Sequence, residues 1–163
     1  MSYLIGTEAF LAQVTTTEGF PGRDASDAEK RAADTARAWA AQVPADLIYL
    51  SVLTIGELLI MRDAARRDLR LLYQLNGLID RLNAFGERTL DVGRQDMSHW
   101  ARIWGALQGT NTFTLEESLI VSQALTRGFT YVGRRSEIVS ALEDGVGLLF
   151  VDPLEWYEQK AKQ

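Results

Sequence analysis

Short strand-like runs alternate with segments of helical periodicity along almost the whole chain. From Leu72 to Phe85, for example, apolar residues recur every three or four positions, which predicts an amphipathic helix. Strands that alternate with helices in this way pair side by side in a parallel sheet that the helices cover. We therefore predict an α/β fold with a central, mainly parallel sheet. The predicted strands are 3–5, 47–51, 89–92, 129–132 and 147–151.

Helix boundaries are indicated by capping signals. Ser or Thr is followed three residues later by Glu at 26–29, 54–57 and 114–117, which is the spacing of a capping box. We expect the three helices to run to about Gln42, through the Arg-rich segment to Arg70, and to Arg127 with Gly128 beyond its end. Further helices are predicted at 8–14, 97–107 and 137–142, and loops at 15–27 and 109–113. Pro153 ends the last predicted strand.

Composition excludes several classes of site. A length of 163 residues fits one domain, which we place at 1–163. The chain has no cysteine, so disulfides and thiolate metal sites are excluded. A net charge of −5 argues against direct DNA binding, which usually needs a basic face. We find no signal peptide and no apolar run near the ~20 residues that span a bilayer, so we expect a cytoplasmic protein without membrane contact.

Acidic residues follow several of the predicted strands or stand in first helical turns. They include Glu8, Glu57, Glu117 and Glu137. Sites in parallel sheets form beyond the carboxyl ends of the strands, so these side chains are candidates to converge there. Carboxylates that converge suit a divalent cation, which can polarise a phosphodiester and activate water. Separated acids have no fixed spacing, however, so this pattern alone does not identify the site.

Four stretches in order narrow the choice, namely 3–8, 51–58, 115–120 and 130–135. Their order and context resemble a PIN domain of the VapC toxin type, a family of small metal-dependent ribonucleases with an α/β/α sandwich fold. In that family the first stretch reads apolar, apolar, Asp, Thr, Asn, and the Asp is a metal ligand. In this chain the corresponding residue is Gly6, so the resemblance implies a nuclease scaffold that lacks its first catalytic carboxylate.

The resemblance assigns the remaining acids residue by residue. Glu57 matches the second acid, in a segment like Ser-x-x-Thr-x-x-Glu-Leu at 51–58, and Glu117 replaces the usual Asp of the third. Glu137 is one residue away from the usual place of a fourth acid. The resemblance implies Mg or Mn as the cofactor of an active member, with Glu57, Glu117, Glu137 and a substitute ligand, Glu8, as the metal ligands.

These residues are compatible with two functions. One is a nuclease-inactive or weakened homologue that binds protein or RNA, because the departures at Gly6, Glu8 and Glu117 surround one pocket. The other is an active endoribonuclease with a rebuilt, all-Glu metal site. Arg134 and Arg135 are candidate substrate-binding residues, and Arg135 could instead enter the pocket and neutralise its acids. Glu57 and Glu117 could also act only as helix caps.

The resemblance also implies partners. VapC-type proteins pair with a small antitoxin protein, form homodimers and often serve plasmid maintenance. The antitoxin supplies the DNA binding that an acidic chain lacks. We place the partner and dimer surfaces on the helices between Arg62 and Phe85, because their leucine content exceeds the need of one buried face.

Overall fold

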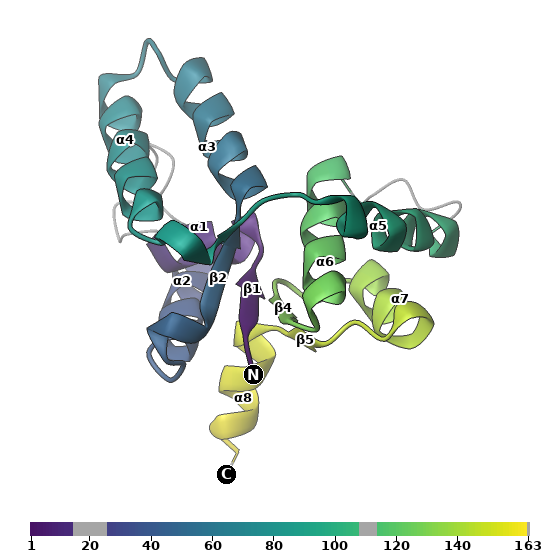
Figure 1. The fold of residues 1–163 in the computed structure, drawn as a ribbon. Helices are drawn as coiled ribbons and strands as arrows, with labels where there is room; N and C mark the ends of the chain where they lie inside the picture. The colour runs from purple at the N-terminus through teal and green to yellow at the C-terminus, as the bar shows by residue number, and fades with distance from the viewer. Residues whose placement is uncertain (15–25, 108–113, 163) are drawn as a thin grey trace.

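The computed structural model describes residues 1–14, 26–107 and 114–162. Within these ranges one parallel sheet of five strands forms the centre of the molecule, in the order β3-β2-β1-β4-β5 (Figure 1). The predicted α/β class is confirmed. The strands are β1 Tyr3–Ile5, β2 Ile48–Ser51, β3 Thr89–Leu90, β4 Thr130–Val132 and β5 Phe150–Val151.

Helices cover both faces of this sheet (Figure 1). Helices α3 and α4 extend together beyond one end of the sheet as a hairpin. On the face of the sheet opposite α1 to α4, α5 and α7 pack beside α6. The helices are α1 Thr7–Val14, α2 Asp27–Ala40, α3 Val52–Ala64, α4 Leu69–Asn83, α5 Arg94–Ala106, α6 Leu115–Arg127, α7 Glu137–Val146 and α8 Pro153–Lys160. Short 3-10 turns span Ala45–Leu47 and Gly86–Arg88.

Two of the three predicted capping boxes are present. Ser26 caps α2 and Thr114 caps α6, and in each case the Glu three residues on bonds back to the cap. The box predicted at Thr54 is wrong: α3 begins at Val52, and the Ser51 hydroxyl accepts the Leu53 N–H at 3.1 Å. Ser51 is the last residue of β2, so the helix follows the strand without a loop and Thr54 lies inside it.

Other boundaries differ from the predictions. The helix expected to run to Arg70 ends at Ala64, and α4 starts anew at Leu69 with Asp68 as its cap. Sequence reasoning missed α8, although Asp152 before Pro153 combines a good N-cap with proline at the first helical position. The predicted turn 109–113 and most of the predicted loop 15–27 lie outside the described residues.

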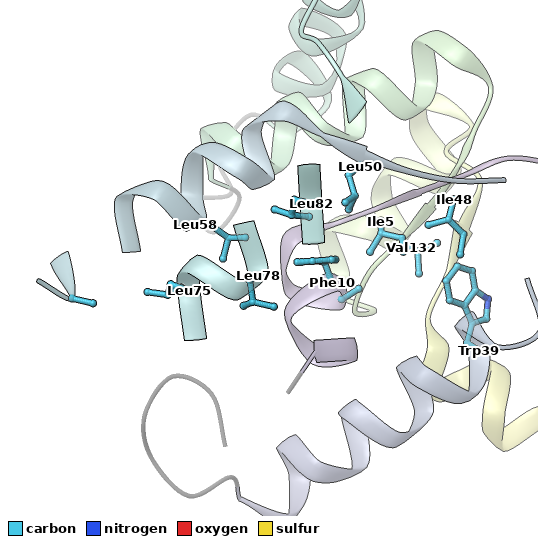
Figure 2. Close-up of a cluster of buried hydrophobic side chains, with 12 residues drawn as sticks. Ile5, Phe10, Trp39, Ile48, Leu50, Leu58, Leu75, Leu78, Leu82 and Val132 are labelled. Carbon is cyan, nitrogen blue, oxygen red and sulfur yellow. The ribbon is translucent and has the colours of Figure 1, made fainter. Parts of the chain in front are cut away.

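The core is divided between the two faces of the sheet, because successive strand residues point to opposite faces. Ile5 and Val132 face α1–α4 and belong to one buried cluster, which extends from Trp39 on α2 to Leu75 on α4 (Figure 2). Leu4 and Tyr131 belong to the other cluster, which they form with residues of α5, α6 and α7. In the pairing of β1 with β4, Leu4 lies beside Tyr131 and Ile5 lies beside Val132.

Candidate functional site

The candidate site lies at the carboxyl ends of β1 and β4. Because β2 and β3 extend the sheet from one side of β1 while β4 and β5 extend it from the other, this is the point where the strand order reverses. In parallel sheets ligands bind at such switch points. Gly6 directly follows β1, and its N–H donates to the carbonyl of Val132 at 2.9 Å. Its own carbonyl accepts from the N–H of Phe10 at 2.9 Å, so α1 starts immediately after the strand.

Tyr131 occupies the space beside Gly6. A Cβ atom built on Gly6 would lie 2.9 Å from Cζ of Tyr131 and closer still to its hydroxyl oxygen. Alternation along the strands places position 6 on the same face as Leu4 and Tyr131, which explains the proximity. Tyr131 is only 7% exposed, and its ring lies 6.0 Å from that of Phe150 between centroids. Sequence reasoning missed this residue as part of the site.

Three carboxylates affect the pKa of the Tyr131 hydroxyl. Burial raises the pKa of Tyr131 above its ordinary value, and the charges of Glu117, Glu8 and Glu57 raise it further. The fold therefore places near Tyr131 three of the four acids that the sequence singled out, one from each of α6, α1 and α3. Glu8 is exposed, whereas Glu57 and Glu117 are partly buried.

Glu57 carries the strongest sign of an unusual environment. Burial raises its pKa, the hydrogen bond from Thr7 lowers it, and the charges of Glu116 and Glu117 raise it. Its Oε2 atom is buried without a hydrogen-bond partner among the described residues. Sequence reasoning missed Glu116. Its position within one helical turn of Glu117 is the sequence signal that could have identified this acidic side chain.

A pair of threonines joins the helices on which two of these acids lie. The hydroxyls of Thr7 on α1 and Thr54 on α3 share a hydrogen bond of 3.0 Å, and Thr54 is completely buried. This bond fixes α1 beside α3, and Glu57 lies one turn beyond Thr54. Thr54, predicted as a cap, thus positions the helix that carries Glu57.

Glu117 has a local structural role. Its Oε2 accepts the backbone N–H of Thr114 at 3.2 Å, and its own N–H donates to the Thr114 hydroxyl at 3.1 Å. These are the two bonds of a capping box, which holds the carboxylate at the start of α6. Capping is therefore confirmed for Glu117.

Arg135 does not enter the pocket, so this alternative is wrong. Its Nε donates to Glu155 at 2.9 and 3.0 Å, and its Nη1 donates to Glu143. The guanidinium also lies over the ring of Phe150, 4.8 Å from the centroid. Acids of α7 and α8 therefore hold this cation. The part in substrate binding expected of Arg135 and the exposed Arg134 stays a prediction.

The donor set does not fit a divalent metal ion. Position 6 offers no side chain, and Tyr131 lies where one would extend. Among the described ranges, no three Asp, Glu, His or Cys side chains are grouped so that they could hold one ion. Glu137, the proposed fourth ligand, is exposed and is not among the charges that raise the pKa of Glu57 or Tyr131. A helix with the length and hydrophobicity of a membrane span is also absent from the described part of the chain.

The fold is similar to that of chains in solved toxin–antitoxin structures. VapBC-1 from nontypeable Haemophilus influenzae matches at 18% identity with a TM-score of 0.64, over 94% of this chain and 98% of that one. FitAcB from Neisseria gonorrhoeae matches at 18% identity and 0.61, over 93% and 97%. VapBC-5 from Mycobacterium tuberculosis, a member of the VapBC family of toxin–antitoxin systems, matches at 16% identity and 0.62, over 93% and 98%.

These similarities establish that almost the whole chain shares the α/β/α fold of the chains in those structures. No protein-family model matches the sequence, and no curated protein matches it. The likeness is thus one of fold, and the chemistry has to be argued from the residues at the ends of β1 and β4.

Proposed function

We propose that this protein is a PIN-like homologue of VapC toxins that has lost metal-dependent nuclease activity and acts by binding another protein. The observation that carries the proposal is Gly6. Carboxylates are the charged protein ligands that hold a hard divalent cation such as Mg²⁺, while water and substrate oxygens complete its coordination. Gly6 supplies none at the end of the central strand, where the resembled family has its first ligand.

The arrangement of the other acids supports the same conclusion. Glu117 is held by its capping box at the start of α6. Glu8 is exposed at the start of α1. The three carboxylates lie near one another but are not directed at one point. They therefore create a negative potential without forming the coordination sphere of a metal ion.

Protein binding is supported by the hairpin of α3 and α4. Ile60 on α3 and Leu69 and Tyr73 on α4 are 70%, 79% and 82% exposed. Large apolar side chains exposed to this degree on adjacent helices are typical of a binding surface rather than of a core. The similar solved structures contain VapB–VapC-type or FitA–FitB-type pairs, which makes a small antitoxin-like protein or a second copy the expected partner.

The first experiment measures RNA cleavage by the intact protein and by Glu57→Gln in Mg²⁺ and in Mn²⁺. We expect both proteins to cleave no faster than a metal-only blank. Cleavage by the intact protein that Glu57→Gln abolishes would overturn the proposal. If the protein binds RNA without cleaving it, the proposed loss of nuclease activity stands, but RNA binding replaces protein binding as the proposed function.

An active enzyme with a rebuilt site is the second candidate. The buried, unpartnered Oε2 of Glu57 favours it, because an unsatisfied carboxylate oxygen is costly unless something binds it. In that case Glu8, Glu57 and Glu117 would have to move toward one ion. A manganese titration compared between the intact protein and Glu57→Gln separates the candidates, and equal titrations would refute the rebuilt site.

A further inference from the structure

The ring of Tyr131 lies between two glycines. On one side a Cβ on Gly6 would come within 2.9 Å of Cζ. On the other side a Cβ on Gly133 would come within 2.8 Å of Cε1 and 3.1 Å of Cζ. Distances below about 3.0 Å are not found for real Cβ atoms, so both positions have to be glycine while the tyrosine keeps this place. The backbone conformation does not require glycine at either position, because neither Gly6 nor Gly133 has a positive φ.

We propose that Tyr131 closes the metal position expected at residue 6, and that the glycines at positions 6 and 133 leave the space that admits its ring. The inference rests on the proposed loss of nuclease activity and gives its structural cause. It implies that Gly6 alone is not the defect. A carboxylate restored at position 6 meets the phenol before it can extend toward Glu57 and Glu117.

The phenol cannot replace the missing ligand. Its hydroxyl is surrounded by the charges of Glu117, Glu8 and Glu57, and its ring is buried. Both effects hold it in the neutral form, because they disfavour a further negative charge. A neutral phenol beside carboxylates can donate a hydrogen bond to one of them, but it is a weaker ligand for a divalent cation than the missing carboxylate because it carries no negative charge.

The ring also cannot leave the position easily. Tyr131 belongs to the buried cluster on the α6 side of the sheet, and Leu4 is its neighbour in the strand register. Protein interiors are close-packed, so a side chain of this size needs an equal space elsewhere. Its strand is paired on both edges, by β1 and by β5, which holds the backbone in place as well.

The test compares Gly6→Asp, Tyr131→Leu and the double variant with the intact protein. Leucine keeps the position apolar but is shorter than tyrosine, so it vacates the space beside position 6. Manganese binding is measured by electron paramagnetic resonance of the free ion, and folding is measured by circular dichroism and thermal unfolding. We expect at most weak binding by the intact protein and by either single variant, and a lower melting temperature for Gly6→Asp.

The double variant is expected to bind Mn²⁺ at least tenfold more tightly than Gly6→Asp, and to lose this binding when Glu57→Gln is added. Tyr131→Phe combined with Gly6→Asp is the matched control. It removes the hydroxyl but leaves Cζ 2.9 Å from the new Cβ, so we expect it to bind more weakly than the leucine version.

The outcomes separate the inference from the proposed function. If Gly6→Asp alone is as stable as the intact protein and binds Mn²⁺ as tightly as the double variant, Tyr131 does not close the site, while the loss of metal binding in the intact protein stands. A folded double variant that binds no better than Gly6→Asp refutes the inference too. Mn²⁺ binding by the intact protein that depends on Glu57 overturns the proposed function itself.

If the double variant does not fold, Gly6→Ala replaces Gly6→Asp and stability becomes the readout. Closure predicts that Gly6→Ala lowers the melting temperature in the intact background and lowers it less in the Tyr131→Leu background. Equal losses in the two backgrounds would show that the ring and position 6 are independent, and would overturn the inference.

Discussion

Gly133 lies against the ring of Tyr131, two residues further along the chain and on the same face of the sheet, so that a Cβ there would come 2.8 Å from Cε1. Gly133→Ala is therefore expected to destabilise the fold by about 1–3 kcal/mol, the usual range for overpacking. Urea unfolding measures the change. Most of the loss should disappear in the Tyr131→Leu background, because leucine has no ring at that distance.

Gly145→Ala is the matched control for this prediction. Gly145 lies within α7, and a Cβ there has open space around it. Alanine is favoured over glycine in a helix by roughly 0.5–1 kcal/mol, so this variant should be neutral or more stable. A loss at Gly133 no larger than that at Gly145 would contradict the contact.

Glu57 should make stability depend on pH. Burial raises its pKa above the ordinary 4.5, so the folded protein holds the proton more tightly than the unfolded chain. The resulting stabilisation is full below the ordinary pKa and is lost as the pH rises through the raised pKa. Glu57→Gln removes that loss, because glutamine stays neutral.

The melting temperatures of Glu57→Gln and the intact protein should agree below the ordinary pKa of Glu57 and diverge as the pH rises through the raised pKa, with the variant higher. We expect a rise of at most a few degrees, since ~1 kcal/mol shifts the midpoint by roughly 2–4 °C in a domain of this size. Asp144→Asn, at an exposed position of α7, serves as the control. A difference that is constant across this range would show that the charge of Glu57 is not the cause.

Arg135 should contribute to stability because it joins α7 to α8. It bonds Glu143 and Glu155, and its backbone N–H donates to Asp152 at 2.8 Å. Arg135→Ala should cost about 1–2 kcal/mol, as expected for a partly exposed network with a cation–π contact, and less at high salt. Arg134→Ala should change stability by less than ~0.5 kcal/mol in the same urea titration. Equal effects of the two variants would contradict the assigned role.

The exposed apolar surface of α3 and α4 should mediate association. Leu69→Ala and Tyr73→Ala are expected to weaken self-association by ~5-fold or more, which corresponds to the ~1 kcal/mol or more that marks the few side chains dominating an interface. Both side chains are largely exposed, so the melting temperature of the separated chain should not change. Sedimentation velocity over a concentration series measures the effect, with Tyr157→Ala on α8 as the control. An unchanged dissociation constant would exclude this surface from self-association.

Local features of the fold were predictable because their physical causes lie within a few residues of each other. The capping boxes at 26–29 and 114–117 and the left-handed Gly128 at the end of α6 each depend on neighbours one turn away. The failure at Thr54 shows the limit of such signals. Thr54 has the spacing of a cap, but its hydroxyl bonds Thr7, which is 47 positions away in sequence.

What the sequence determined by itself is the α/β order of the chain and the absence of a carboxylate at Gly6, since both can be read from residue type and spacing. Only the tertiary structure decided what replaces that carboxylate. The register of β4 against β1 pairs Tyr131 with Leu4, so that its ring reaches Gly6 on the same face of the sheet, and acids of α7 and α8 hold Arg135. Side chains compete for a space or a charge through contacts between residues far apart in the chain, so their outcome depends on packing that no local pattern records.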